Sequence, residues 1–452
     1  MTPTRRRYLE AVAGGSVASL AGCVDRLRDL RAGTTIHAPS TAAVTDRLDV
    51  EVTGLDSREP VWVEAHTTDG SGHEWFGRVL VDPDRDRVAL RDAQPRRGTY
   101  RAPSGMGLFW SMQPADLDRL VYDADQRVQS VRLRVVPDGS GGVDEGVSPL
   151  TETTVDRRLA APESTETDLT EPIVGTLVEP PTDGPAPGVV LFHGSSGNRS
   201  LAPARVLASR GFTVLALQYF SPEYPRLPDA LVEVPVEYAD RAVEWLADHE
   251  ATTDDPIGLG GFSRGGELAL LVGTRHEVSA VVNWVGAGLL FNAVVLGDDL
   301  GVSDQSPDTS AWTVGGDPLP HPSRDDFELG GNLTDAYRAW LDATPEETIE
   351  AAEIPLEQVE APILLVSAGD DGVWPSRYLL NRAEKRLDAP DYAYRVEHHS
   401  YDDAGHGIGV PVLPTWPNRP GGPFGGTLAG TAAAEADSWP RAVEFFERGV
   451  ER

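Results

Sequence analysis

The chain has 452 residues, with 71 acidic and 39 basic side chains that give a formal net charge of −32 and a sequence pI near 4.6. Nucleic-acid binding depends on basic patches, so a chain this acidic excludes nucleic acid as a partner. Lys385 is the only lysine, and acidic excess with arginine in place of lysine predicts a surface hydrated in concentrated salt, hence a halophilic source. One cysteine allows no internal disulfide, and without an H-E-x-x-H motif the sequence predicts neither a metal site nor a cofactor.

Residues 1–23 have the pattern of an export signal. Arg5 and Arg6 form a twin-arginine pair, and the apolar stretch 11–21 that follows is too short to span a bilayer by itself. This stretch runs into Leu20-Ala21-Gly22-Cys23, which is typical of a lipobox and predicts lipid attachment at Cys23. We therefore expect export and anchoring to the outer face of the cell membrane; the alternative, if the signal is misinterpreted, is a cytoplasmic protein.

Residues 33–150 predict a β-sandwich domain. Short runs of alternating apolar and polar residues, among them 48–52, 61–65 and 131–135, are separated by turn residues about every ten positions. This spacing is typical of two packed antiparallel sheets. Residues 138–170 are rich in Gly, Ser, Thr, Asp and Glu, and this composition predicts a connector.

From residue 169 to residue 452 strands alternate with helices, which predicts an α/β domain with a mostly parallel sheet. The predicted strands are 187–192, 213–218, 257–262, 278–285, 361–367 and 392–397, and the predicted helices are 234–249, 267–272 and 432–452. The acidic stretch 287–350 lacks a clear period. It predicts an insertion between strands, where hydrolases place lids and acyl pockets.

A G-x-S-x-G motif, residues 261–265, joins the end of one predicted strand to the start of a predicted helix. In an α/β-hydrolase this turn lifts a serine above the sheet, and its glycines make room for a strained backbone. The motif alone is a weak signal. In this strand–turn–helix context it makes Ser263 a candidate nucleophile.

A serine nucleophile needs an imidazole to take its proton and a carboxylate to orient that imidazole. Asp370 and Asp371 directly follow a buried-looking strand; Asp371 is favoured as the acid, and Asp370 is the alternative acid or a cap of the next helix. His406 lies in a glycine-flanked loop further on. The order serine, acid, histidine is the order that the α/β-hydrolase fold uses.

The developing oxyanion needs backbone N–H donors. The loop after strand 187–192 contains Gly194 and Ser195, and Arg264 follows the candidate nucleophile, so these three residues form the predicted oxyanion hole. Three histidines near predicted strand ends are interpreted as structural: His193, His398 and His399.

Several stretches, three of them without catalytic residues, resemble in the same order the acyl-CoA thioesterases related to bile acid-CoA:amino acid N-acyltransferase. They are 105–112, 207–212, 236–238, 261–268, 370–374 and 404–406 with the following Pro411. The resemblance covers nearly all of the chain after the predicted signal. It implies a β-sandwich followed by an α/β-hydrolase domain, and a Ser263, Asp371 and His406 triad that acts on acyl thioesters. The transferase branch of the family uses a cysteine nucleophile, so the serine here favours transfer of the acyl group to water.

Three functions remain open at this point. The first is an acyl-CoA thioesterase that works through an acyl-enzyme. Because acyl-CoA is cytoplasmic and the N-terminus predicts export, the second is a membrane-anchored carboxylesterase or acyltransferase for other acyl esters. The third is a non-catalytic surface lipoprotein that binds ligands through the sandwich, against which the complete triad argues. The expected partners are the acyl substrate and, through Cys23, a membrane.

Overall fold

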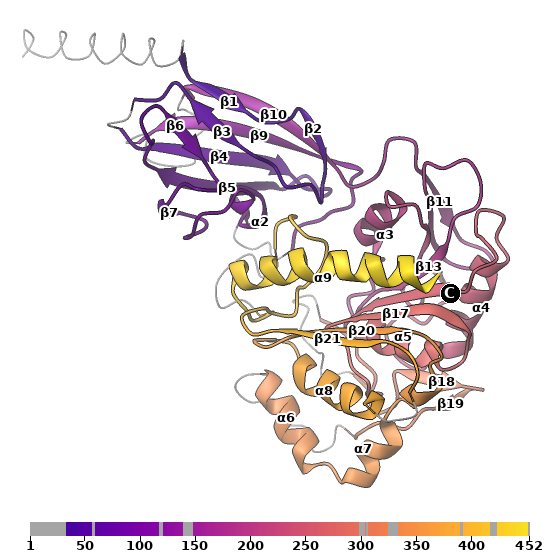
Figure 1. Cartoon of the computed structure of the whole chain (residues 1–452). Helices are drawn as coiled ribbons and strands as arrows, with labels where there is room; N and C mark the ends of the chain where they lie inside the picture. Colours follow the sequence, from indigo (N-terminus) through magenta and orange to yellow (C-terminus); the bar gives the residue numbers. More distant parts are fainter. Residues whose placement is uncertain are drawn as a thin grey trace, which may run out of the picture.

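The computed structural model describes residues 33–56, 59–116, 121–138, 148–297, 303, 306–323, 333–388, 392–415 and 423–450. The predicted export signal with Cys23 lies outside these residues. Along the chain a β-sandwich comes first and a larger layered α/β domain follows (Figure 1). Within the described ranges no helix has both the length and the apolar character needed to cross a membrane.

Two sheets form the sandwich. The smaller has the order β1-β3-β6, and the larger has the order β2-β10-β9-β4-β5-β7 with β8 paired to β5. The strands are β1 (Thr35–His37), β2 (Thr41–Ala43), β3 (Glu51–Thr53), β4 (Val61–Thr68), β5 (Glu74–Val81), β6 (Arg87–Ala89), β7 (Pro95–Gly98), β8 (Gln113–Pro114), β9 (Val128–Pro137) and β10 (Thr151–Arg158), and the short helix α2 (Gly107–Trp110) lies between β7 and β8. The first six residues of β9 alternate between exposed and buried, as the period of two in a half-buried strand requires.

The predicted connector 138–170 was wrong over two stretches. Strand β10 pairs antiparallel with β9 from Thr151 opposite Val135 to Arg158 opposite Val128, so the sandwich continues beyond residue 150. Strand β11 (Thr165–Leu169) belongs to the sheet of the second domain. Both strands are rich in Thr, Glu and Asp, because many of their positions are partly exposed. This composition is also that of a loop, so the sequence predicted a connector.

The second domain is built on an eight-stranded sheet with the order β11-β12-β14-β13-β16-β17-β20-β21. Its further strands are β12 (Gly175–Glu179), β13 (Gly188–Phe192), β14 (Thr213–Leu217), β16 (Ile257–Phe262), β17 (Val278–Trp284), β20 (Ile363–Ala368) and β21 (Val396–Tyr401). Strand β12 is antiparallel to both neighbours, and every pair from β14 to β21 is parallel. Parallel neighbours place the carboxyl ends of their strands at one edge, where the loops with the candidate site residues begin.

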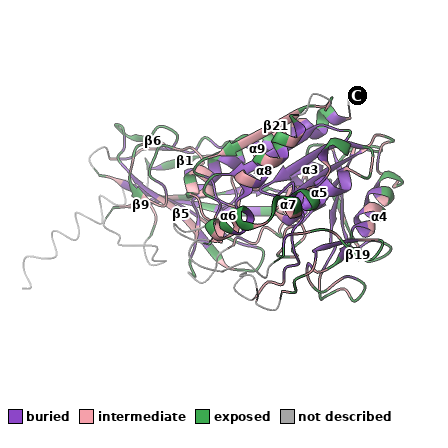
Figure 2. Ribbon diagram, turned by 90° about the horizontal axis from the view of Figure 1, so that it is seen from below, coloured by how far each residue is buried: buried purple, intermediate pink, exposed green. Residues whose placement is uncertain are grey.

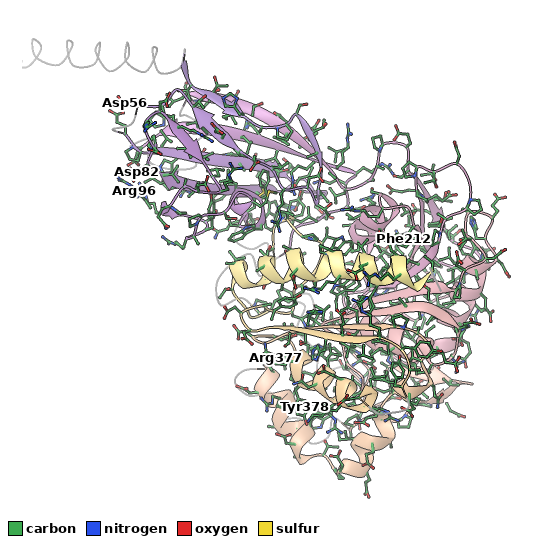
Figure 3. The ribbon with its side chains drawn as sticks, viewed as in Figure 1. Asp56, Asp82, Arg96, Phe212, Arg377 and Tyr378 are labelled. Carbon is green, nitrogen blue, oxygen red and sulfur yellow. The ribbon has the colours of Figure 1, made fainter. Side chains whose placement is uncertain are left out.

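Helices cover both faces of this sheet (Figure 1). The helices α3 (Leu201–Ala208) and α9 (Leu428–Gly449) cover one face, and α4 (Val236–Ala247), α5 (Arg264–Gly273) and α8 (Ser376–Leu387) cover the other. Successive residues of β13 point to opposite faces: Leu191 packs in the cluster with Phe446 of α9, and Phe192 packs in the cluster on the opposite face. The strands are therefore buried on both sides (Figure 2). Beside α9, Phe212 (labelled in Figure 3) meets Phe446 of that helix edge-on, with ring centroids 6.1 Å apart.

The insertion between β17 and β20 contains more regular structure than its sequence predicts. It includes β18 (Trp312–Val314), β19 (Asp317–Pro318), α6 (Leu333–Ala343), α7 (Glu346–Ala352) and the 3-10 helix η1 (Leu356–Gln358). Strand β15 (Val234–Pro235) pairs with β18 in a small third sheet. A separate apolar cluster that includes Phe291, Trp340 and Trp374 packs this insertion onto the sheet edge.

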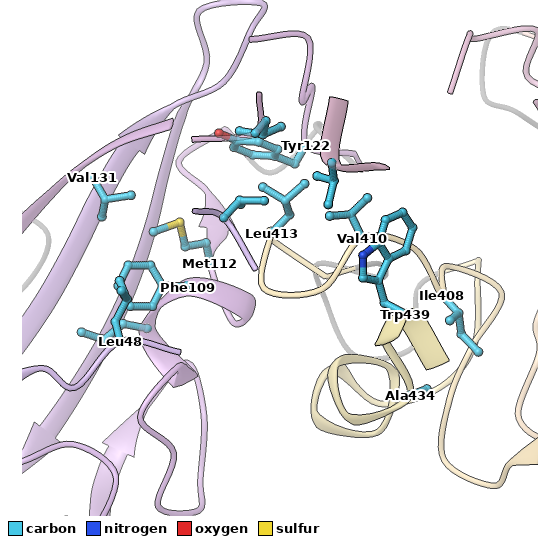
Figure 4. Close-up of a cluster of buried hydrophobic side chains, with 14 of the residues drawn as sticks. Leu48, Phe109, Met112, Tyr122, Val131, Ile408, Val410, Leu413, Ala434 and Trp439 are labelled. Atoms are coloured by element: carbon cyan, nitrogen blue, oxygen red, sulfur yellow. The ribbon is translucent and has the colours of Figure 1, made fainter. Parts of the chain in front are cut away.

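The sandwich and the α/β domain share one apolar core. Phe109 and Met112 of the sandwich belong to the same buried cluster as Val410, Leu413 and Trp439 of the second domain (Figure 4). A backbone hydrogen bond from the Thr415 N–H to the Trp110 carbonyl, at 3.0 Å, crosses the same contact. Because burial of apolar area is the main stabilising term, this shared core fixes how the two domains sit together.

One buried carboxyl at this contact makes folding stability depend on pH. Glu435 of α9 is 3% exposed and accepts a hydrogen bond from the Thr415 hydroxyl at 3.0 Å. Burial raises its pKa well above the ordinary value of 4.5, so its contribution to stability is full below pH 4.5 and falls as pH rises toward the folded-state pKa. We expect Glu435→Gln to gain stability relative to wild type by about 1 kcal/mol per pH unit as pH rises from about 5 toward the folded-state pKa of Glu435.

Chemical denaturation of both proteins at several pH values measures this gain. Glu447→Gln, on the exposed face of the same helix, is the control that should show no such trend. A stability difference between Glu435→Gln and wild type that stays constant with pH would contradict the prediction.

Candidate active site

The backbone at Ser263 has the strained geometry of a nucleophile elbow. This residue joins β16 to α5 with φ 54° and ψ −121°, a region that non-glycine residues adopt at a cost of about 1–3 kcal/mol. The Ser263 N–H donates to the Trp284 carbonyl at 2.8 Å and holds the turn. A Cβ on Gly261 would lie 2.0 Å from the Gly265 carbonyl oxygen, and one on Gly265 would lie 2.3 Å from that of Phe192. Both motif positions therefore require glycine.

The three predicted triad residues lie together at the carboxyl edge of the sheet. Ser263 follows β16, Asp371 follows β20, and His406 follows β21. The His406 Nε2 atom is 3.0 Å from the Ser263 Oγ, and its Nδ1 atom is 3.0 Å from the Asp371 Oδ2. With Nδ1–H donating to the carboxylate, Nε2 is left to accept the serine proton, which is the arrangement that a general base requires.

The carboxylate of Asp371 is held in a fixed orientation. Its Oδ1 accepts from the backbone N–H groups of Val373 at 3.0 Å and Trp374 at 3.2 Å, and its Oδ2 also accepts from the Ser376 hydroxyl at 2.6 Å. Asp371 is 4% exposed, so these donors replace water around the buried charge. Sequence reasoning missed Ser376, whose only signal is its place soon after the Asp-Asp turn.

Asp370 has a different role from either one considered in the sequence. Its exposed carboxylate accepts from the Gly426 N–H at 3.1 Å, on the loop that packs behind His406. Helix α8 has no side-chain cap at its N-terminus, so the interpretation of Asp370 as a helix cap was wrong. The chain turns at Asp370, and that turn directs the carboxylate toward the loop rather than toward the helix.

Two of the three predicted oxyanion donors, Gly194 and Arg264, lie next to the nucleophile. Gly194 lies so close that a Cβ on it would be 3.3 Å from the Ser263 Cβ, and Ser195 follows half-buried in the same loop. Arg264 is the first residue of α5, so its N–H has no acceptor within the helix. The three residues stay the predicted donors for the carbonyl oxygen that would develop charge above the Ser263 hydroxyl.

His193 supports the loop that carries these donors. Its ring is 1% exposed and stacks on Tyr219 with centroids 4.0 Å apart, and the Tyr219 hydroxyl donates to the His193 carbonyl. Burial lowers the pKa of His193 to about 4, so the ring is neutral near pH 7. This environment agrees with the structural interpretation of this histidine.

A buried ion pair under the elbow went unnoticed in the sequence. The Arg264 Nε lies 2.9 Å from the Glu267 Oε2, and the same guanidinium donates to the Phe291 carbonyl at 3.2 Å. The other Glu267 oxygen accepts from Trp312 Nε1 at 2.6 Å and from the Phe291 N–H at 3.1 Å. Burial raises the pKa of Glu267 to about 7. This pair ties the nucleophile turn to the insertion that follows β17, and its only sequence signal is two opposite charges three residues apart.

A second chain of contacts also joins a serine, a histidine and a carboxylate, but in a different setting. Ser367 Oγ is 2.8 Å from His398 Nε2, and His398 Nδ1 is 3.0 Å from Glu384 Oε2. Ser367 is 0% exposed inside β20 and donates to the Ser400 hydroxyl at 2.9 Å, so no substrate can reach it. His399 pairs with Glu397 at 2.9 Å. Among the described residues no three potential ligands cluster closely enough to hold a metal ion.

The mostly parallel eight-stranded sheet, the elbow serine and the loops at its carboxyl edge define the chain as an α/β-hydrolase. Residues 45–171 match the family described as Acyl-CoA thioester hydrolase/BAAT N-terminal region, and residues 234–452 match the one described as BAAT / Acyl-CoA thioester hydrolase C terminal. The chain therefore belongs to the acyl-CoA thioester hydrolase/BAAT family, which confirms the resemblance predicted from the sequence, and it is an enzyme related to the acyl-CoA thioesterases.

Curated relatives of both branches are similar over almost their full length. Acyl-coenzyme A thioesterase 6 of Homo sapiens is 28% identical over 431 residues, which are 92% of this chain and 97% of the relative. Acyl-coenzyme A thioesterase 1 of Rattus norvegicus is 27% identical over 89% of this chain and 93% of its own. The bile acid-CoA:amino acid N-acyltransferase of Mus musculus is 27% identical over 91% of this chain and 96% of its own.

Proposed function

We propose that this enzyme hydrolyses acyl-CoA thioesters through an acyl-enzyme on Ser263. The observation that supports this most directly is the pair of 3.0 Å contacts that join Ser263 to His406 and His406 to Asp371. The names of the relatives, most of which are acyl-coenzyme A thioesterases, support the thioester as the substrate. Serine at the nucleophile position favours water over an amino group as the acyl acceptor.

The proposed reaction has two stages that use the same groups. Ser263 Oγ attacks the thioester carbonyl carbon while His406 Nε2 takes the hydroxyl proton, and the N–H groups of Gly194 or Ser195 and of Arg264 hold the oxyanion. Collapse of the tetrahedral intermediate breaks the C–S bond, and His406 gives its proton to the leaving thiolate. A water molecule then attacks the acyl-enzyme with His406 as base, which releases the carboxylic acid and restores the Ser263 hydroxyl.

A hydrolysis screen tests the choice of substrate. Purified protein in high salt is offered acyl-CoA thioesters and simple oxygen esters with the same acyl chains. We expect kcat/KM to favour the CoA thioesters, with release of free thiol and fatty acid in equal amounts. Preference for oxygen esters would favour the second candidate, an exported carboxylesterase, and turnover of neither substrate would contradict hydrolysis.

The second candidate is motivated by the N-terminus, and we further propose that the protein is exported and lipid-anchored at Cys23. One acyl chain binds membranes only marginally, so stable retention requires two or more chains on Cys23. We expect the protein to fractionate with membranes and to lack its first 22 residues by mass spectrometry. Cys23→Ser should release the protein from the membrane or leave its signal uncleaved. The double variant Arg5→Lys, Arg6→Lys should keep the protein inside the cell. An intact Met1 on a soluble cytoplasmic protein would contradict this proposal.

A further inference from the structure

A large groove separates helix α9 from the sandwich domain. Its volume is about 1730 Å³, and its walls come from both domains: Met106 and Trp110 on the sandwich side, and Ala433, Trp439 and Val443 on α9. The α9 positions that line it run from Leu428 to Arg448, which at 1.5 Å per residue corresponds to a length of about 30 Å. The groove is therefore long enough for an extended ligand that has both apolar and polar parts.

One end of the groove lies behind the loop that carries His406. Gly426 and Thr427 line this end. A Cβ on Gly426 would lie 2.1 Å from the backbone nitrogen of Gly405, the residue before His406, and the Thr427 N–H donates to the Asp403 carbonyl at 2.9 Å. The groove thus starts at the backbone that positions the imidazole and runs away from it along α9.

The chemistry of the triad places the leaving group on this side of the site. The histidine that takes the serine proton later gives it to the leaving atom, so the leaving sulfur must lie beside His406 Nε2. The remainder of the leaving group then extends past the His406 loop, while the acyl chain extends in another direction from the carbonyl carbon. A leaving-group arm that continues past this loop reaches the end of the groove at Gly426.

The charge of the groove differs in sign from that of the chain. Five arginines line it against three acids; they are Arg47, Arg91, Arg101, Arg210 and Arg448, and Asp49, Glu444 and Glu447. Arg91 pairs with Asp49 and Asp92, and Arg448 pairs with Glu444. Within the described ranges the exposed side chains of Arg47, Arg101 and Arg210 make no ion pair. In a chain with a net charge of −32, an arginine-lined groove of positive formal charge is suited to an anion.

We propose that this groove binds the phosphate-bearing nucleotide arm of the coenzyme A leaving group, with Arg101 and Arg210 as its phosphate ligands. Arg101 reaches the groove from the sandwich and Arg210 from the turn after α3, so the two side chains come from different domains. Guanidinium groups bind phosphate through paired, charge-assisted hydrogen bonds, and the apolar floor fits the uncharged arm that joins the phosphates to the sulfur. This inference rests on the proposed function, since it assigns a place to the leaving group of that reaction.

The test compares two thioesters of one acyl chain, one on coenzyme A and one on the short, uncharged N-acetylcysteamine. In the double variant Arg101→Ser, Arg210→Ser we expect KM for the CoA thioester to rise about tenfold or more with kcat nearly unchanged. KM for the N-acetylcysteamine thioester should stay at the wild-type value. Measurements use the lowest salt that keeps the protein folded, because salt screens exposed charges.

The matched control is Arg132→Ser, Arg158→Ser, which removes two exposed arginines from the sandwich outside the groove. Calorimetric titration with free coenzyme A gives a readout that does not depend on turnover. Binding that weakens in the groove variant and not in the control supports the groove, even where neither thioester is hydrolysed and the proposed function has failed. Equal KM changes for both thioesters, or coenzyme A binding that is the same in both variants, would overturn the proposal.

Discussion

Ser263→Ala is expected to remove hydrolysis, with a loss on the order of 10⁶-fold in kcat, while the protein stays folded. The substitution deletes the hydroxyl that lies 3.0 Å from His406 Nε2 and leaves the strained backbone and the imidazole in place. Steady-state rates on an acyl-CoA substrate measure the loss, and circular dichroism checks the fold. The residual rate would reflect only binding and the oxyanion donors.

The chain provides a matched control for this variant. Ser367 has the same kind of contact, with His398 at 2.8 Å, but it is buried inside β20. We expect Ser367→Ala to retain kcat within a few fold, even if it lowers stability by about 1 kcal/mol through the lost hydrogen bond. Near-normal activity in Ser263→Ala, or a comparable loss in Ser367→Ala, would show that the elbow serine is not the nucleophile.

The position of the candidate site could be predicted because it depends on strand ends. Ser263 and Asp371 each follow a strand that the apolar pattern marks, and parallel strands end at one edge. His406 follows β21, a strand of mostly polar residues that the predicted strand 392–397 overlaps only at Val396 and Glu397. The glycines around Ser263 carry a local signal, since the turn leaves no space for a Cβ on either side. Such features can be read from a sequence because each one is set by neighbouring residues.

The groups that support the site could not be predicted, because their partners come from distant segments. Glu267 accepts a hydrogen bond from Trp312 of the insertion, 45 residues away along the chain. Glu435 accepts a hydrogen bond from the Thr415 hydroxyl at the domain contact. The residues next to Glu435 in the sequence do not indicate that it is buried. The sequence of β10 resembles a connector because threonine and acidic residues are common in loops. The segment is a strand because it pairs with β9.

Asp371→Asn is expected to lower kcat on the order of 10⁴-fold with little change in the fold. Asp371 Oδ1 faces the N–H groups of Val373 and Trp374, so the asparagine carbonyl oxygen will take that side. The amide NH₂ then faces His406 Nδ1, which must become an acceptor. The proton moves to Nε2, where it faces Ser263, and the imidazole can no longer take the serine proton. Rates on the same substrate measure the loss, and an intact unfolding transition shows that the fold is kept.

Asp370→Asn is the matched control, because it changes the neighbouring carboxylate in the same way. The carboxylate of Asp370 is exposed and, within the described part of the chain, accepts a hydrogen bond from the Gly426 N–H at 3.1 Å. An asparagine oxygen can keep that bond. We therefore expect kcat within a few fold of wild type. The reverse outcome would mean that Asp370 orients the imidazole in solution, and it would require the loop that carries His406 to shift relative to β20.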